Sequence, residues 1–248
     1  MKNSTIMSHS GTYDSRVYFN AEGLAIKPAY VSFVDIMGMA TAMALSLRRS
    51  ANFMGRFHVA LLSISSMVPK CKVYPVMDGA YVVSDNLRFM LTFLHKLFEY
   101  LSLMFVNADD LSKCFLIRGS IAYGDVVLGA DINKQVSIEL SDDDLYKRNL
   151  LMGVPVAHAF LCADKAPPYG IFIDDTIRAR QDSKMSGIWY RWWSKMQENI
   201  AKKVGLQLER YFKWTKERCD EIMYNLDKQN AHESLARQYW SPFYPQNV

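Results

Sequence analysis

Cysteine is scarce in this chain, and its spacing excludes the common cysteine-rich sites. None of the four cysteines forms a CxxC pair: they are Cys71, Cys114, Cys162 and Cys219. Zinc ribbons and thioredoxin-like motifs both require such pairs. The N-terminus, which begins Met1-Lys2-Asn3, also lacks the apolar core of a signal peptide. We therefore expect reduced thiols and a cytoplasmic location.

A large excess of one charge and a long uncharged apolar run are missing as well. The 248 residues include 29 Lys and Arg against 25 Asp and Glu. The resulting net charge of +4 is far below that typical of proteins that bind long nucleic acids. The most hydrophobic stretch, residues 28–47, is interrupted by Asp35 and followed by Arg48, so it is too short to span a bilayer. We expect a soluble protein whose partners include neither nucleic acid nor membrane.

The chain does have enough apolar sequence for a large core. Half of its residues (50%) are apolar, and the length suits one large domain with an elaboration. Apolar runs predict strands over 30–36, 72–78, 80–84, 114–122, 126–128 and 169–173, and helices over 38–66, 85–106 and 156–163. This β-α-β-β-α-β order, followed by β-α-β, predicts an α+β, ferredoxin-like fold with helices on one face of the sheet.

The predicted domain organisation has three parts. Residues 1–27 form a polar N-terminal arm, residues 28–180 the main domain, and residues 181–248 a C-terminal helical extension. The extension holds a cluster of three tryptophans, Trp189, Trp192 and Trp193. Such aromatics can form a platform for RNA or a membrane, but we favour packing against the main domain.

Two aspartates are the strongest candidates for chemistry. Asp35 ends an apolar strand, where a charge is costly unless it is paired or bound to a metal. Asp78 lies at the hairpin tip that Asp78-Gly79 predicts. The first strand of a β-α-β-β unit neighbours the hairpin, so both carboxylates can converge and hold two divalent cations against a triphosphate. The alternative is that Asp35 caps the next helix and Asp78 is only a turn residue.

The remaining polar residues carry weaker signals. The chain passes from Asp35 through Gly38 into a helix start, whose free amides can bind a phosphate. Asp142, Asp143 and Asp144 form a cluster for which a solvated loop or helix start is preferred over a metal site. The five histidines show no ligand spacing.

Four segments resemble the motifs of class III nucleotide cyclases, in the same order and at a similar spacing. They are FVDIMGM (33–39), MDGAYVV (77–83), RGSIAYGDVVLG (118–129) and GVPVAHAFLCAD (153–164). The resemblance covers about residues 28–175, and its first motif is the most specific. Within the family, the chain looks most like the bacterial pyrimidine (uridylate and cytidylate) cyclases of Pycsar antiphage systems.

The resemblance implies a metal-dependent reaction. Asp35, Asp78 and the Ile36 carbonyl would hold two Mn²⁺ or Mg²⁺ ions. The β- and γ-phosphates would be bound by three backbone amides, those of Met37, Gly38 and Met39. The ribose 3′-hydroxyl would attack the α-phosphate in line and release pyrophosphate.

The resemblance also implies a base-reading residue and a homodimer. Lys72 aligns with the base-selecting lysine of adenylate cyclases. Six strand residues place Lys72 roughly 20 Å from Asp78, which is too far for both to act on one nucleotide. A head-to-tail dimer would bring Lys72 of one chain into the site of its partner.

The chain departs from the adenylate cyclase pattern at three positions. Leu150 replaces an acidic base-reading residue, Ala157 a ribose-orienting asparagine and Leu161 a transition-state arginine. Lys72 and Arg118 remain as basic candidates for the base or the developing charge, and their donors suit the carbonyl oxygens of uracil. We therefore expect UTP as the substrate, with CTP as the alternative. The product, cyclic UMP, would be a messenger to a downstream effector in antiphage defence.

Other interpretations stay open. Arg118 would serve equally well in a salt bridge across the sheet. A cyclase-like regulatory module that binds nucleotide without turnover would explain Ala157 and Leu161. An RNA-binding domain of the same topology is faintly suggested by residues 118–124, although its base-stacking positions are mostly aliphatic here.

Overall fold

The computed structural model describes residues 19–180, 185 and 187–245. Most of the predicted N-terminal arm, and the predicted boundary at 181, lie outside these residues. The described residues form two compact units. The smaller unit runs up to Ala25 and over Val127–Leu150, and the larger unit covers Ile26–Val126 and continues from Leu151. The C-terminal residues thus belong to the larger unit, so these units do not follow the predicted boundaries at 27 and 180.

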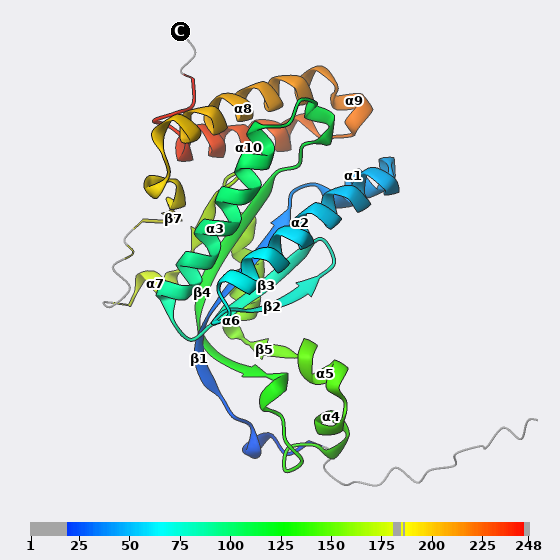
Figure 1. Cartoon of the computed structure of the whole chain (residues 1–248), viewed down its shortest axis with the longest axis vertical. Helices are drawn as coiled ribbons and strands as arrows, with labels where there is room; N and C mark the ends of the chain where they lie inside the picture. Colours follow the sequence, from blue (N-terminus) through cyan, green and yellow to red (C-terminus); the bar gives the residue numbers. More distant parts are fainter. Residues whose placement is uncertain (1–18, 181–184, 186, 246–248) are drawn as a thin grey trace, which may run out of the picture. The chain divides into compact units, whose positions relative to one another are not determined.

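The larger unit is built on a mixed sheet (Figure 1). Its strands are β1 (Lys27–Ile36), β2 (Lys72–Val76), β3 (Gly79–Ser84), β4 (Ile117–Leu128), β5 (Leu151–Gly153), β6 (Ile171–Ile173) and β7 (Trp189–Tyr190). Their order is β2-β3-β1-β4-β6-β7, and β5 pairs with β4 beside this path. β1 is antiparallel to β3 and β4, whereas β4 is parallel to β6. The order β2-β3-β1-β4 is ferredoxin-like, which confirms the predicted α+β fold.

Helices cover both faces of this sheet, and those packed against its strands include α2 (Leu47–Met67), α3 (Leu87–Val106) and α6 (Val154–Ala163). Gly119 of β4 faces α3, because a Cβ at this position would contact Phe98 at 3.1 Å. Phe33 of β1 points to the opposite face, where its ring packs on Phe160 of α6 at 5.2 Å between centroids. The prediction of helices on one face is therefore wrong. Since α2 and α3 already bury the first face, α6 occupies the second.

The hairpin turns one residue earlier than predicted. Val76 of β2 pairs with Gly79 of β3, so the two-residue loop is Met77-Asp78, and Met77 adopts a left-handed conformation (φ 51°). Gly79 lies inside β3, where a Cβ would come within 2.8 Å of the Phe33 ring. The glycine is therefore required for close packing against β1, and Asp78 remains in the turn.

Two other predicted elements have different bounds. The helix predicted over 38–66 is broken at Ser46, which separates α1 (Met39–Leu45) from α2. Ser46 has an extended backbone, and its hydroxyl accepts a hydrogen bond from the amide of Arg49. The strands predicted over 114–122 and 126–128 are the single strand β4, preceded by the short helix η2 (Leu111–Lys113).

The smaller unit contains short helices: η1 (Ala21–Gly23), η3 (Gly129–Asp131), α4 (Ile138–Asp142) and α5 (Asp144–Asn149). The aspartate cluster at 142–144 is a helix start, because Asp143 caps α5 by accepting a hydrogen bond from the Tyr146 amide at 2.8 Å. Leu150 also belongs to this unit, where its carbonyl accepts a hydrogen bond from the Gly129 amide at 2.8 Å.

The C-terminal extension packs against the core of the larger unit, as predicted. After α7 (Asp175–Arg178) and β7, it consists of η4 (Trp192–Lys195), α8 (Glu198–Glu217), α9 (Cys219–Ile222) and α10 (Leu226–Tyr239). Trp192 and Trp240 are fully buried, and their indole nitrogens donate to the carbonyls of Tyr169 (2.8 Å) and Pro168 (3.2 Å). Trp193 is buried too, whereas Trp189 is half-buried in β7. These rings therefore belong to the core rather than to an exposed platform.

α3 is the one described helix that is long and apolar enough to cross a membrane by these two criteria. Its apolar face is part of the core, because Met90, Phe93, Leu94 and Leu97 are fully buried. Length and hydropathy therefore select α3, a core helix, whereas the sequence analysis considered residues 28–47.

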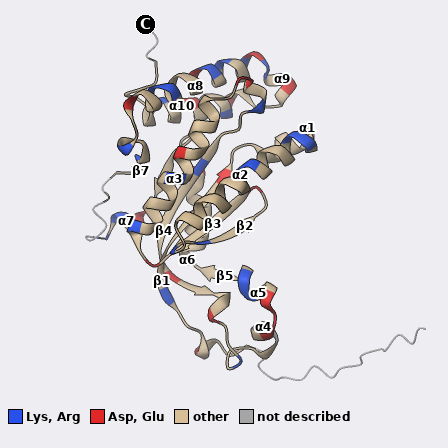
Figure 2. Ribbon diagram, in the orientation of Figure 1, with Lys and Arg blue, Asp and Glu red and all other residues tan. Residues whose placement is uncertain are grey.

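The charged side chains are mixed along the described helices. Both α5 and α8 carry Lys and Arg as well as Asp and Glu (Figure 2).

Candidate functional site

Asp35 lies at the end of β1, between two strands that position its neighbours. In the sheet register it is opposite Arg118 of β4 and Gly79 of β3. Because side chains alternate along a strand, Asp35 and Arg118 both lie on the face that α6 covers. The sheet thereby brings together an acid and a base that are 83 residues apart.

Arg118 holds Asp35 in a two-pronged ion pair. The arginine Nε donates to Asp35 Oδ1 at 3.1 Å, and its Nη2 donates to Oδ2 at 3.3 Å. The Asp35 and Arg118 side chains are only 14% and 18% exposed. The arginine Nη1 also pairs with Oδ1 of Asp164, which follows the last turn of α6, at 2.5 Å. The salt bridge across the sheet, one of the two interpretations of Arg118, is therefore present.

Burial raises the pKa of Asp35 above its usual value, although Arg118 acts in the opposite direction through its charge and hydrogen bonds. The carboxylates of Asp78 and Asp164 add to the increase, since like charges disfavour ionisation. We call Asp35, Asp78, Arg118 and Asp164 the Asp35 group; it contains three carboxylates and one guanidinium, which pairs with Asp35 and Asp164. The group has an excess of negative charge that a cation would neutralise.

Asp78 reaches this group from the hairpin turn. Its backbone carbonyl accepts a hydrogen bond from the Ile36 amide at 3.2 Å, which fixes the turn against the end of β1. Its carboxylate is close enough to Asp35 to raise the pKa of that group. The structure therefore brings the two aspartates chosen from the sequence to one end of the sheet.

The oxygen donors at this end of the sheet suit a hard divalent cation. Asp35 and Asp78 offer carboxylates and Ile36 a backbone carbonyl, which are the ligand types that Mg²⁺ and Mn²⁺ prefer. In the described part of the chain, no group of three or more His, Cys, Asp or Glu side chains is arranged to hold a metal ion. An ion at this position would complete its coordination with water and phosphate oxygens.

The turn after Asp35 provides only part of the predicted phosphate cradle. The amide of Met37 donates to the carbonyl of Leu116 at 2.8 Å and is therefore engaged within the protein. Gly38 has a left-handed backbone conformation (φ 77°), which favours glycine. A Cβ at this position would meet open space, so packing does not require glycine here. Gly38 and Met39 both border a cavity.

Lys72 is not part of the Asp35 group within one chain. It is exposed at the start of β2, opposite Val83, whereas Asp35 lies beside the other end of the hairpin. The two α6 positions at which the sequence departs from the adenylate cyclase pattern, Ala157 and Leu161, are exposed.

Sequence reasoning missed Asp164, the second carboxylate bound to Arg118. Its position at the end of the fourth motif segment was the available signal. It also missed Arg49, Tyr224 and Lys228, which line a cavity together with Arg118. These residues come from α2 and from around the start of α10, and no local pattern in the sequence connects them with β4.

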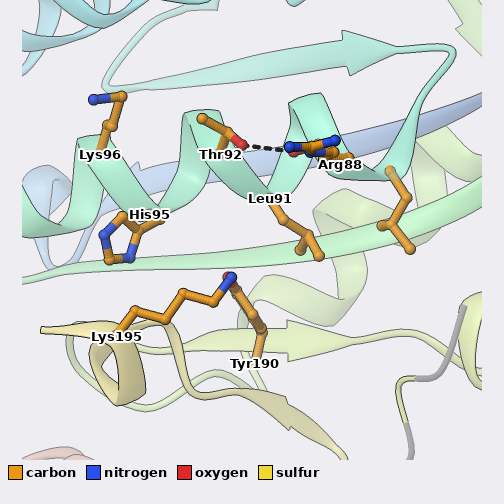
Figure 3. Close-up of a pocket in the computed structure, with 8 residues that line it drawn as sticks. Arg88, Leu91, Thr92, His95, Lys96, Tyr190 and Lys195 are labelled. Atoms are coloured by element: carbon orange, nitrogen blue, oxygen red, sulfur yellow. Dashed lines mark hydrogen bonds between the residues drawn. The ribbon is translucent and has the colours of Figure 1, made fainter.

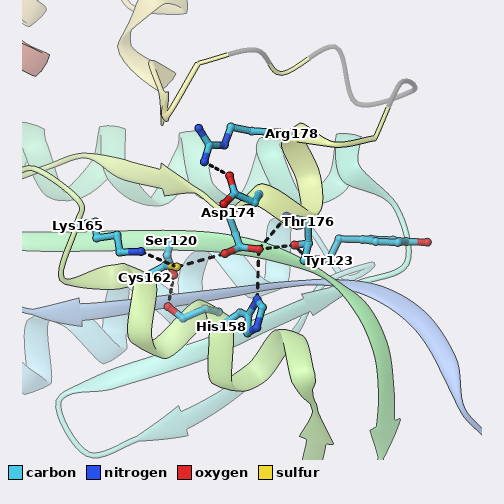
Figure 4. Close-up of polar contacts among 10 residues, drawn as sticks. Ser120, Tyr123, His158, Cys162, Lys165, Asp174, Thr176 and Arg178 are labelled. Atoms are coloured by element: carbon cyan, nitrogen blue, oxygen red, sulfur yellow. Dashed lines mark hydrogen bonds and ion pairs between the residues drawn. The ribbon is translucent and has the colours of Figure 1, made fainter.

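A second polar cluster surrounds Asp174 (Figure 4). Its Oδ1 accepts hydrogen bonds from the Thr176 amide (2.9 Å) and hydroxyl (2.6 Å), and its Oδ2 accepts one from the Cys162 thiol (3.3 Å). The Nδ1 atom of His158 lies 3.4 Å from Oδ1. Burial and the neighbouring Asp174 raise the pKa of Cys162 to about 11, which keeps the thiol protonated at neutral pH. The cluster is therefore not a nucleophilic site, although it contains Cys, His and Asp.

A third candidate is a cavity of about 500 Å³ between α3 and the β7–η4 segment (Figure 3). Its basic lining comes from Arg88, Lys96 and Lys195, and the Nδ1 atom of His95 lies 3.0 Å from the carbonyl of Trp192. None of the described residues that line it is Asp or Glu. The cavity therefore lacks the carboxylates that a metal-dependent site needs.

Two comparisons with known proteins find no counterpart. No family model matches the sequence, and no curated protein matches it.

Solved structures do match the fold. A bacterial light-regulated adenylyl cyclase aligns with a TM-score of 0.51 and 12% identity, over 63% of this chain and 45% of that one. An adenylate/guanylate cyclase/hydrolase from Silicibacter pomeroyi aligns with a TM-score of 0.50 and 13% identity, over 65% and 84%. The monomeric guanylyl cyclase domain of the RhoGC fusion protein from the aquatic fungus Blastocladiella emersonii gives 0.48 and 14%, over 63% and 86%. At these identities the first two likenesses concern the fold alone, which is that of class III cyclase domains.

Proposed function

We propose that this protein is a nucleotide cyclase that converts UTP to 3′,5′-cyclic UMP and pyrophosphate, with CTP as the alternative substrate. The observation that carries the proposal is the convergence of Asp35 and Asp78 at one end of the sheet in a fold of the cyclase type. The groups described there include three carboxylates, a backbone carbonyl and one arginine. Such a set of groups is suited to phosphoryl chemistry.

In this proposal Asp35, Asp78 and the Ile36 carbonyl hold two Mg²⁺ or Mn²⁺ ions. When bound, these ions lower the pKa of the ribose 3′-hydroxyl and neutralise the phosphates. Arg118, fixed by Asp35 and Asp164, keeps a guanidinium beside the charge that develops on the α-phosphate. The 3′-oxygen bonds to the α-phosphorus, the bond to the leaving pyrophosphate breaks, and the hydroxyl proton passes to solvent.

The base site requires a second copy of the chain. Lys72 lies roughly 20 Å from Asp78 along its strand, so it serves the partner's nucleotide. The exposed surface of α6 supports such a dimer, because Val154, Phe160 and Leu161 are 67%, 55% and 65% exposed. Apolar side chains gathered on one helix are typical of an interface. Lys72 of the partner subunit would then donate to a carbonyl oxygen of uracil, which favours UTP.

The biological role follows from the resemblance to pyrimidine cyclases. Cyclic UMP would act in the cytoplasm as a second messenger for a cyclic-nucleotide-responsive effector in antiphage defence.

A regulatory module that binds nucleotide without turnover is the second candidate function. The ion pair favours it, because Arg118 occupies both oxygens of Asp35 in the folded chain. For catalysis, a bound cation must compete with this guanidinium.

Incubation with each nucleoside triphosphate separates the two functions. The purified chain is supplied with Mn²⁺ or Mg²⁺, and cyclic products and pyrophosphate are quantified by chromatography. We expect cyclic UMP as the main product, lost in Asp35→Ala and retained in Asp85→Ala, which removes an exposed carboxylate. Metal-dependent binding of UTP without any cyclic product would support the regulatory module instead.

A mixing experiment tests the dimer. Asp35→Ala and Lys72→Ala are each expected to be inactive. In an equal mixture half of the dimers are mixed, and each of these has one intact site, so about one quarter of the wild-type activity should return. Recovery of no activity would contradict a site shared between chains.

A further inference from the structure

The C-terminal extension borders the Asp35 group. Within the larger unit, α9 contacts α1 (Figure 1), and a cavity of about 480 Å³ lies among these elements. Gly38 and Met39 line it on the side of β1, and Arg118 lines it on the side of β4. Tyr224 and Lys228, which flank the start of α10, line it on the side of the extension.

Positive charge from three separate elements meets in this cavity. Arg49 comes from α2, Arg118 from β4 and Lys228 from α10. Among the described residues that line the cavity, Asp164 is the one carboxylate, and it is already bound to Arg118. Because Arg118 is bound to Asp35 as well, Arg49 and Lys228 are the two cationic side chains of the lining that these carboxylates do not hold.

Arg49 provides a second, independent observation, an unused hydrogen-bond donor beside the cavity. Its Nε atom is buried and has no hydrogen-bond partner among the described residues. An unpaired buried donor of a charged group costs free energy unless an acceptor is present. A bound phosphate would supply that acceptor, and arginine is suited to bind phosphate oxygens with two donors.

Tyr224 and His232 shape the wall of the cavity without adding charge. The Tyr224 hydroxyl lies 2.5 Å from Nδ1 of His232. Burial, assisted by the charges of Arg118 and Lys228, lowers the pKa of His232 to about 4, so the imidazole is neutral at pH 7. Arg118 and Lys228 therefore both act on His232 in the cavity wall.

We propose that this cavity binds the pyrophosphate end of the nucleoside triphosphate, and that Lys228 and Arg49 supply the cationic groups within the same chain. The extension would then be part of the active site rather than only a support for the core. Its lysine would provide positive charge that Leu161, in the arginine position of the adenylate cyclase pattern, cannot provide. The identity of the ligand as a triphosphate rests on the proposed function, whereas binding of a polyphosphate does not.

Binding of inorganic pyrophosphate to the full chain tests this inference directly. Calorimetry is done without nucleotide on the wild type, Arg49→Gln, Lys228→Gln and the control Lys203→Gln, which removes an exposed lysine of α8 outside the cavity. We expect a loss of affinity of about tenfold or more for each cavity variant and none for the control. Trp214 lines the cavity, so its fluorescence should report the same binding. If the wild type does not bind pyrophosphate, or all variants bind it equally, the inference is wrong.

Cyclase assays of the same variants separate this inference from the proposed function. The KM for UTP should rise about tenfold or more in Lys228→Gln, and the melting temperature should be unchanged because Lys228 is exposed. Pyrophosphate binding that depends on Lys228 in a protein without cyclic product would overturn the proposed function and support the cavity. Normal cyclase activity with an unchanged KM and unchanged pyrophosphate affinity in both cavity variants would do the reverse.

Discussion

Asp35 and Asp174 both have largely buried carboxylates in the larger unit, but the protein compensates their negative charges differently. The side chain of Asp35 is 14% exposed and shares the Arg118 guanidinium with Asp164, and burial raises its pKa. The side chain of Asp174 is 10% exposed. Burial alone would raise its pKa, but hydrogen bonds from Thr176, Cys162 and His158 outweigh this effect and lower the pKa to about 2.

The difference separates a structural carboxylate from one available to a ligand. The hydrogen bonds of Asp174 come from its own chain, so the folded protein already compensates its charge. Asp35 and its neighbours have more negative charge than the protein compensates, which is the situation expected where a cation binds. The comparison predicts that changes at Asp35 affect chemistry, and changes at Asp174 affect stability.

The largest effect is expected for Asp35→Asn. Loss of one metal-binding carboxylate should lower the rate of cyclic nucleotide formation by about 10²–10³-fold, because charge neutralisation at the phosphates is lost. The free energy of unfolding should change by no more than about 1 kcal/mol, because Arg118 keeps Asp164 as a partner. Product assays and urea unfolding measure the two effects. Strong destabilisation with full activity would contradict the assigned difference.

Asp174→Asn is expected to show the opposite behaviour. An amide cannot replace a carboxylate that accepts hydrogen bonds on both oxygens, so the free energy of unfolding should fall by about 2 kcal/mol. The activity per folded molecule should stay within about twofold of the wild type, because Asp174 does not line the cavity beside Asp35. Asp175→Asn is the matched control, since Asp175 is exposed and should change stability by less than about 0.5 kcal/mol.

The acid unfolding of the protein should depend on Asp174. The pKa of this group is about 2 in the folded chain and near its usual 3.8 when unfolded, so its ionised form stabilises the fold. This contribution is complete above about pH 5 and is lost as the pH falls from about 4 towards 2. Urea unfolding at a series of pH values should show a shallower decline for Asp174→Asn than for the wild type. Parallel curves would show that Asp174 is not responsible.

The smallest effects are expected for Thr176 and His158, two residues that contact Asp174. Thr176 donates two hydrogen bonds to Asp174, one from its hydroxyl at 2.6 Å, whereas His158 lies at 3.4 Å with a side chain that is 43% exposed. Thr176→Val should therefore cost about 1 kcal/mol of unfolding free energy, and His158→Gln less than about 0.5 kcal/mol. Chemical denaturation distinguishes the two. Equal effects would mean that the histidine contributes more than its exposure suggests.

Much of the fold was predictable because local patterns specify it. Apolar runs identified β1 and β3, and apolar residues at helical spacing identified α3. The hairpin was predicted too, although its turn is Met77-Asp78 because Gly79 is needed against Phe33. Ser46 caps α2 at the break between the two helices. The break was not predicted, because the apolar pattern continues across Ser46. The second face of the sheet was not predictable, because it depends on which helices already cover the first.

In the candidate site, too, some residues were predictable from the sequence and others were not. Asp35 and Asp78 were found because each follows or joins strands whose order was correctly inferred. Asp164, Arg49 and Lys228 were not found, because they meet Arg118 only through the packing of α6, α2 and α10. Contacts between residues so far apart in the chain cannot be predicted from a local sequence pattern.

The sequence alone determined the order of strands and helices, the hairpin and the two aspartates at one end of the sheet, because hydrophobic periodicity and turn residues act over short distances. Only the tertiary structure decided that Arg118 pairs with both Asp35 and Asp164, that α6 covers the second face, and that the C-terminal helices border a cavity beside these residues. These features come from contacts between distant segments, whose energies depend on how the whole chain packs.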